Sequence, residues 1–120
     1  MKMKAKIYYL STCSTCTQIL KRLNPGPDVE LQDIKIQAIT PEQLDGMKAM
    51  AGKYEDLFSR RALKYKEMGL ASKDLTEQDY RSLILEEYTF LKRPVMILGD
   101  QIFVGNAKRT VEEAIAAFGK

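Results

Sequence analysis

The first 36 residues read as a strand, a helix and a second strand, and this order constrains the fold more than any other feature. Residues 4–10 are a short, apolar, β-prone run that stops at Ser11 and Thr12. From Ser14 the apolar residues recur at the 3.6-residue spacing of a helix, which the Asn-Pro-Gly-Pro stretch at 24–27 ends. Residues 29–36 alternate as a second strand. A right-handed βαβ unit with parallel strands follows, and the chain is predicted to be an α/β protein.

The rest of the chain adds helices and then a hairpin. A helix is expected from the Thr40 cap to about residue 51, helix-prone sequence from 54 to 70, and an amphipathic helix from Thr76. Two short apolar runs, 94–98 and 101–104, are joined by Gly99-Asp100 and predict a β-hairpin. A capping box at Thr110 predicts the start of a last helix. The predicted order is therefore β-α-β, helical insert, β-β-α.

A chain of 120 residues, 45% of them hydrophobic, is long enough for one compact domain, and one domain over residues 1–120 is predicted. The 19 Lys and Arg residues outnumber the 16 Asp and Glu residues by only three, and the charges are interspersed, so no direct nucleic-acid binding is expected. No apolar stretch approaches the roughly 20 residues of a membrane span, and the apolar run at the N-terminus is too short for a signal peptide. We therefore expect a cytoplasmic protein without membrane contact.

Two cysteines form the motif Cys13-Ser14-Thr15-Cys16 where the first strand gives way to the helix. In a reducing compartment such a pair is more often catalytic, redox-sensing or metal-binding than a permanent disulfide. A metal site is disfavoured, because two Cys and no His fall short of the usual ligand set for zinc. Without His, any nucleophile must be activated by fixed charge, by a helix terminus or by its surroundings.

The helix start explains why Cys13 is the candidate nucleophile. The N-terminus of a helix offers unpaired N–H groups and roughly half a positive charge, which favour a thiolate. A free cysteine with a pKa near ~8.5 is only ~3% ionised at neutral pH, whereas a pKa of ~6 would ionise ~90% of it. Cys16 lies one turn further and is placed to attack an adduct on Cys13. The alternative is that both cysteines are small buried apolar residues, and it applies more to Cys16, which lies on the apolar helix face.

Two arginine motifs are the other candidate site features. Arg93-Pro94 precedes the apolar run 95–98, and its ordinary interpretation is a strand start with a surface arginine. An X-Pro bond can also be cis at modest cost. Arg60 and Arg61 form the only adjacent Arg pair, and such a pair is most often a solvated helix face. Either motif could instead hold an anion.

These features together resemble the arsenate reductase (ArsC) family, which includes the redox-sensing Spx regulators. The resemblance covers essentially the whole chain and is most specific at residues 11–16, 59–69 and 91–105. It implies a thioredoxin-like fold with a mixed four-stranded sheet and a cis-proline loop, at Pro94, opposite the reactive cysteine.

The resemblance also implies roles for particular residues. Cys13 takes the place of the reactive cysteine, Arg61 that of the middle arginine, and Arg93 that of the arginine before the proline. Ser14 is expected to take part in substrate binding, and Cys16 or an external thiol to resolve the adduct on Cys13. No bound cofactor or metal is implied. The expected electron donor is glutathione or thioredoxin, with glutaredoxin/glutathione or thioredoxin as the partner of a monomeric protein.

Two functions follow from the resemblance. The first is a thiol-dependent oxidoreductase in which the Cys13 thiolate attacks an oxyanion, such as arsenate, or a disulfide. The alternative is an Spx-like redox-sensing transcriptional regulator that binds the C-terminal domain of the RNA polymerase α subunit. The sequence departs from the arsenate reductases in having Val104-Gly105-Asn106 where they carry a further arginine, and in having Cys16. A relative that uses glutathione on another substrate is therefore a third possibility.

Overall fold

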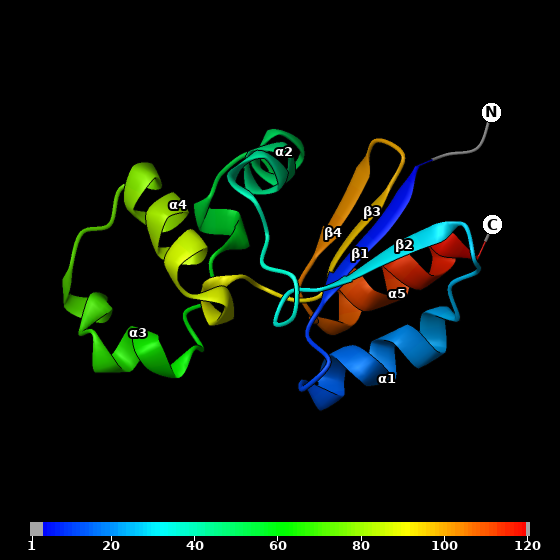
Figure 1. The fold of residues 1–120 in the computed structure, drawn as a ribbon, viewed down its shortest axis with the longest axis horizontal. Coiled ribbons are helices and arrows are strands. Elements are labelled where there is room, and N and C mark those ends of the chain that lie inside the picture. Colours follow the sequence, from blue (N-terminus) through cyan, green and yellow to red (C-terminus); the bar gives the residue numbers. More distant parts are fainter. Residues whose placement is uncertain (1–3, 120) are drawn as a thin grey trace. The chain divides into compact units, whose positions relative to one another are not determined.

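The computed structural model describes residues 4–119, which form two compact units (Figure 1). One unit comprises residues 4–38 and 93–119 and contains the sheet, and the other comprises residues 39–92 and contains the helical insert. No helix within residues 4–119 is long and apolar enough to cross a membrane. That all 120 residues act as one domain stays a prediction.

The sheet has four strands in the order β2-β1-β3-β4. Its strands are β1 (Ala5–Tyr9), β2 (Val29–Asp33), β3 (Val95–Leu98) and β4 (Gln101–Val104). Strands β1 and β2 are parallel, while β1 pairs antiparallel with β3 and β3 antiparallel with β4. The predicted mixed four-stranded α/β fold, including the β3–β4 hairpin, is confirmed.

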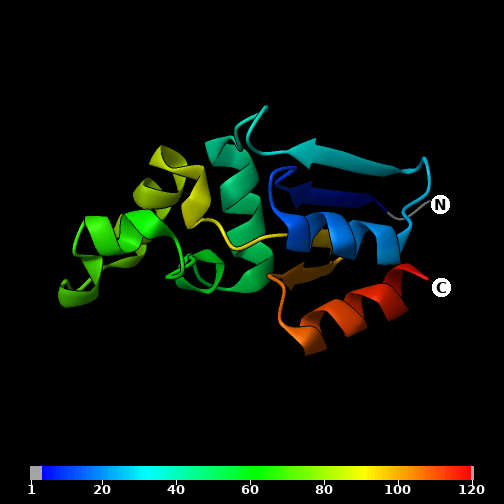
Figure 2. The same cartoon turned by 90° about the horizontal axis from the view of Figure 1, so that it is seen from below.

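Helices α1 (Ser14–Leu23) and α5 (Lys108–Phe118) lie side by side on one face of this sheet, as Figure 2 shows. An ion pair of 2.7 Å joins Arg22 of α1 to Glu112 of α5 at the surface. Beneath it the two helices bury apolar side chains against β1 and β3, which removes them from water and supplies most of the unit's stability. The buried cluster consists of Ile7, Ile19, Met96, Val111 and Ala114.

Two element boundaries differ from the sequence predictions. Helix α5 begins at Lys108 with Ala107 as its N-cap, because the Val111 N–H already donates to the Ala107 carbonyl at 3.0 Å. The predicted capping box at Thr110 was therefore wrong. Strand β2 ends at Asp33 and does not reach residue 36, since the Gln37 N–H donates to the Asp33 carbonyl at 2.8 Å and turns the chain.

The second unit contains α2 (Pro41–Ala51), α3 (Leu63–Glu67) and α4 (Glu77–Glu86), with short 3-10 segments between and after them. Helices α2 and α4 begin with capping boxes at Thr40 and Thr76, each of which stabilises its helix by about 1 kcal/mol. The helix-prone stretch 54–70 contains only one five-residue α-helix, α3, which has no buried residue. Burial of an amphipathic face usually stabilises a helix, so α3 stays short.

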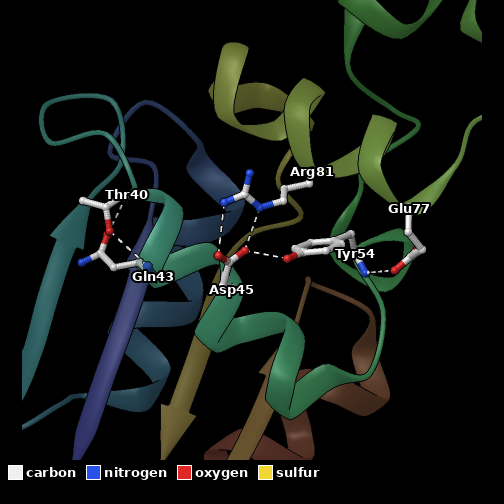
Figure 3. A network of polar contacts seen from close by, with 6 residues as sticks. All are labelled: Thr40, Gln43, Asp45, Tyr54, Glu77 and Arg81. Carbon is white, nitrogen blue, oxygen red and sulfur yellow. Dashed lines mark hydrogen bonds and ion pairs between the residues drawn. The ribbon is translucent and has the colours of Figure 1, made fainter.

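A polar network connects α2 and α4 within this unit (Figure 3). The Arg81 guanidinium donates to both Asp45 oxygens at 2.8 and 3.1 Å, and the Tyr54 hydroxyl donates to the same carboxylate. Glu77 accepts the N–H groups of Tyr54 and Glu55 at 2.8 and 3.1 Å. Hydrogen bonds from Arg81, with those from Tyr54, lower the pKa of Asp45 to about 2. These groups are largely solvated, so the network sets geometry more than stability.

Candidate active site

Cys13 occupies the N-cap position of α1, at the end of a tight turn that follows β1. Its N–H donates to the Leu10 carbonyl at 3.0 Å, and its carbonyl accepts the Thr17 N–H at 3.1 Å. With φ −98° and ψ 112° its backbone is extended, as a cap residue requires. The side chain is half-buried. The turn thus holds the sulfur at the end of the helix where N–H groups are unpaired.

The surroundings of Cys13 lower the pKa of its thiol. Burial is the largest single effect and raises the pKa, but four other effects together outweigh it. The Cys16 N–H, the Cys16 thiol, the positive charge of Arg93 and the Thr15 N–H all favour the thiolate, in that order. The side chain makes no capping hydrogen bond of ordinary geometry. The N–H groups therefore act mainly on the charged form, as the helix terminus predicts.

Cys16 is a different kind of thiol. It lies on the buried face of α1 with 0% of its surface exposed, and both cysteines are free. Burial, together with the neighbouring Cys13, raises the pKa of Cys16 to about 11, although the Leu10 N–H opposes the shift. At neutral pH Cys16 is therefore a neutral thiol, and its presence favours the ionised form of Cys13.

Arg93 and Pro94 lie at the start of β3, beside the turn at residues 10–13 that ends at Cys13, which is called the reactive turn below. The Arg93–Pro94 peptide bond is cis, and the Pro94 side chain is buried. The Pro94 carbonyl accepts the Gly105 N–H at 2.9 Å, and Gly105 has a φ of 91°, which favours glycine. Arg93 is half-buried and acts electrostatically on both cysteines. The first unit thus brings Cys13, Cys16 and Arg93 together.

Ser14 is the first residue of α1 and directly follows the cysteine. Its side chain is exposed, and its carbonyl accepts the Thr17 hydroxyl at 2.9 Å. The Ser14 side chain is thus accessible to solvent next to Cys13 in the chain. Its expected part in substrate binding stays a prediction.

Arg61 belongs to the second unit, on the loop between Phe58 and α3. The base of this loop is fixed, because the Ser59 N–H donates to the Phe90 carbonyl at 2.7 Å and Phe58 forms an isolated bridge with Leu91. The Phe58 ring also stacks on Phe90 with centroids 5.0 Å apart. The loop therefore projects from a rigid aromatic core.

The two adjacent arginines of this loop differ in their contacts. Arg60 donates to Glu55 at 2.8 Å and to the Tyr80 hydroxyl at 3.0 Å, and its guanidinium lies over the Tyr80 ring. Arg61 is exposed, and within the described residues its guanidinium makes no ion pair or hydrogen bond. Arg60 thus belongs to the scaffold, and Arg61 is available to a ligand. The sequence singled out Arg61 by its spacing to Tyr65, and its role stays a prediction.

One contact of the reactive turn was missed in the sequence. The Asp33 carboxylate, at the end of β2, accepts the Ser11 N–H at 3.4 Å. The signal available was topological: the carboxyl ends of two adjacent parallel strands meet at one edge of a sheet, so a polar residue ending β2 lies beside the turn that follows β1.

Among residues 4–119 no group of three or more His, Cys, Asp or Glu side chains is arranged to hold a metal ion. In the first unit the candidate site consists of Cys13, Cys16 and Arg93.

The mixed sheet, the C-x-x-C motif at the start of α1 and the cis-proline before β3 define a thioredoxin-like protein. Solved structures agree. An arsenate reductase from Vibrio cholerae aligns with a TM-score of 0.77 at 19% identity, covering 97% of this chain and 98% of that one. A putative ArsC family related protein from Bacteroides fragilis aligns with a TM-score of 0.75 at 24% sequence identity, and the alignment covers 95% of this chain and 99% of that one. A Staphylococcus aureus protein aligns with a TM-score of 0.73 at 27% identity, covering 92% of this chain and 97% of that one.

The family is shown by the sequence itself. The ArsC family model matches residues 8–114, which is most of the chain and includes Cys13, Arg61 and Arg93. This chain belongs to the ArsC family. A comparison with curated proteins found no match.

The electrostatic role of Arg93 leads to a first prediction. Replacing it in Arg93→Ala removes a cation that favours the Cys13 thiolate, so the pKa of Cys13 should rise and its alkylation at neutral pH should slow about fivefold. Iodoacetamide labelling followed by mass spectrometry measures this rate. Arg93→Lys keeps the charge and should retain most of the reactivity. Equal rates in wild type and Arg93→Ala would show that Arg93 does not act on the thiolate.

Proposed function

We propose that this chain is a thiol-dependent oxidoreductase of the arsenate reductase type, in which the Cys13 thiolate attacks an oxyanion or disulfide substrate. The observation that carries the proposal is the position of Cys13 at the N-cap of α1, where N–H groups, the Cys16 thiol and Arg93 all favour its ionised form. Membership of the ArsC family supports the same chemistry.

With arsenate as the substrate, the reaction has two steps. The Cys13 sulfur first bonds to arsenic, and one arsenate oxygen leaves as water after taking up protons. A second thiolate then attacks the Cys13 sulfur, a disulfide forms, and the electron pair of the broken S–As bond stays on arsenic. Arsenic is thereby reduced from As(V) to As(III), and two thiols are oxidised. An external thiol reduces the disulfide and returns Cys13 to its starting state.

The anion-holding groups in this proposal are Arg93, Arg61 and Ser14. Arg93 acts on the cysteines in the same unit, and its fork of donors suits a tetrahedral oxyanion. Arg61 enters through the family resemblance and through its exposed guanidinium. The Ser14 hydroxyl stands beside the nucleophile. Preorganised donors of this kind stabilise the charge that develops on the substrate oxygens.

The burial of Cys16 favours an external thiol as the second nucleophile. A buried thiol with a pKa near 11 is almost entirely protonated at neutral pH, whereas a small thiol such as glutathione reaches the half-buried Cys13 from solvent. Glutathione with glutaredoxin is therefore the proposed donor, and thioredoxin the alternative. Cys16 then serves chiefly to favour the ionised form of Cys13.

The central test is an NADPH-coupled arsenate reduction assay. Wild type and Cys13→Ser are compared with glutathione and glutaredoxin, and separately with thioredoxin. Turnover should be abolished in Cys13→Ser, because a serine hydroxyl is not ionised at neutral pH and cannot form the disulfide. Full activity in Cys13→Ser would exclude this mechanism.

Cys16→Ala is the matched control in that assay. It should retain turnover with glutathione and glutaredoxin if an external thiol resolves the adduct. Loss of turnover in Cys16→Ala, with thioredoxin as the working donor, would instead assign the resolving step to Cys16. No turnover of wild type with either donor would exclude arsenate as the substrate.

The arginine pair supplies a further prediction. Arg61→Ala should lower kcat/KM for an anionic substrate about tenfold or more, the usual cost of one charged hydrogen bond, without lowering Tm. Arg60→Ala is the control, and it should lower Tm because it breaks the contacts with Glu55 and Tyr80. Steady-state kinetics and thermal unfolding of both variants check this. A wild-type kcat/KM in Arg61→Ala would remove Arg61 from the site.

A second candidate function is redox-dependent regulation of transcription, as in Spx. The observation that favours it is the pair of free thiols, Cys13 and Cys16, which lie in one C-x-x-C motif and affect each other's pKa. The partner would be the C-terminal domain of the RNA polymerase α subunit. A pull-down with reduced and with oxidised protein tests it, and absence of binding in both states would exclude this function.

A further inference from the structure

We propose that Asp33 is a positioning residue for the Cys13 nucleophile: its carboxylate anchors the turn at residues 10–13 and so keeps Cys13 over the N-terminus of α1. This inference rests on the proposed function only in naming Cys13 as the nucleophile. The contacts of Asp33 and the labelling experiment below concern the position and reactivity of the Cys13 thiol, not turnover of a substrate.

The parallel pairing of β1 and β2 brings Asp33 to the turn. In the register of the two strands Tyr9 is the partner of Asp33, and the ladder continues with the Ile34 N–H donating to the Tyr9 carbonyl at 2.9 Å. Both strands run toward the same edge of the sheet. The end of β2 therefore lies beside the first residues after β1, and these residues lead to Cys13.

The Asp33 carboxylate binds the first central residue of the turn. Its Oδ1 accepts the Ser11 N–H at 3.4 Å and the Lys35 N–H at 3.1 Å, so one carboxylate joins the segments that follow both strands. The Ser11 side chain has the largest of the effects that lower the pKa of Asp33. The carboxylate is thus ionised at neutral pH and acts as an acceptor for the N–H groups of Ser11 and Lys35.

The turn at residues 10–13 gains from such an anchor because it is short and exposed to solvent, so few contacts of its own hold it in place. Ser11 and Thr12 are exposed, and within the turn one backbone bond, from the Cys13 N–H to the Leu10 carbonyl, closes the loop. The pKa of Cys13 depends on the closeness of its sulfur to the N–H groups of Cys16 and Thr15. Small displacements of the turn would weaken these contacts, as hydrogen bonds fall off steeply with distance and angle.

The sign of the effect separates positioning from simple electrostatics. A carboxylate near a thiolate repels it, so removing the charge alone would lower the pKa of Cys13 or leave it unchanged. Loss of the anchor should raise the pKa of Cys13, because a Cys13 that is no longer held in place moves away from the N–H groups that favour its thiolate. Asp33→Ala removes both the charge and the acceptor, whereas Asp33→Asn removes the charge and keeps an acceptor oxygen.

The experiment measures alkylation of Cys13 by iodoacetamide, residue by residue by mass spectrometry, over a pH range that spans the thiol titration. Asp33→Ala should raise the apparent pKa of Cys13 and slow its labelling at neutral pH about three- to tenfold, the size of effect expected for loss of one ordinary hydrogen bond. Asp33→Asn should restore most of the wild-type rate. Thermal unfolding of each variant confirms that it is folded.

Glu30→Ala is the matched control, since Glu30 is an exposed carboxylate on the same strand that pairs with Lys6 at 3.0 Å. Glu30→Ala should leave the apparent pKa and the labelling rate of Cys13 unchanged. An unchanged or lowered pKa of Cys13 in folded Asp33→Ala, or an Asp33→Asn variant as impaired as Asp33→Ala, would overturn the proposal. Labelling requires no substrate, so a failure here is distinct from failure of the arsenate assay.

Discussion

The interaction between the Cys13 sulfur and the N-terminus of α1 is the one on which the rest of the account depends. A chain without His lacks the side chain that most often deprotonates a nucleophile near neutral pH. Backbone N–H groups replace that base by favouring the thiolate permanently, and Arg93 adds a cation that does not titrate. Burial opposes this arrangement, because it raises the pKa of both cysteines. At Cys13 the other effects outweigh it, whereas at Cys16 it dominates.

The sheet provides this arrangement through its strand order. Central strands β1 and β3 place the reactive turn and the Arg93–Pro94 pair next to one another, because their antiparallel pairing brings the end of β1 to the start of β3. Edge strand β2 contributes Asp33 from the other side of β1. Helices α1 and α5 cover one face and share a buried cluster, which fixes the orientation of α1. The start of α1 and the start of β3 thereby act on one thiol, and the proposed anchor at the end of β2 adds a third segment.

Local signals in the sequence were sufficient for the order of strands and helices along the chain, for the C-x-x-C motif and for the hairpin, because a few consecutive residues determine each of them. The mixed four-stranded sheet was expected only from the family resemblance, since the order of strands in a sheet depends on contacts between distant residues. The start of the last helix was predicted too far along the chain. The sequence around Thr110 matches a capping box, whereas the actual N-cap, Ala107, has no side chain that could mark it as a cap. Asp33 was missed because its contact with Ser11 spans 22 positions and depends on strand register. Likewise, only the folded insert shows that Arg60 is held by Glu55 and Tyr80 while Arg61 is exposed.

The most direct test of the central claim is a titration of the Cys13 thiolate by its ultraviolet absorbance in wild-type protein, with Cys13→Ser as the blank. A difference titration with a pKa clearly below the value of about 8.5 for a free cysteine is the predicted result. A pKa at or above that value would contradict the account, because it would show that the end of α1 and Arg93 do not outweigh burial at Cys13.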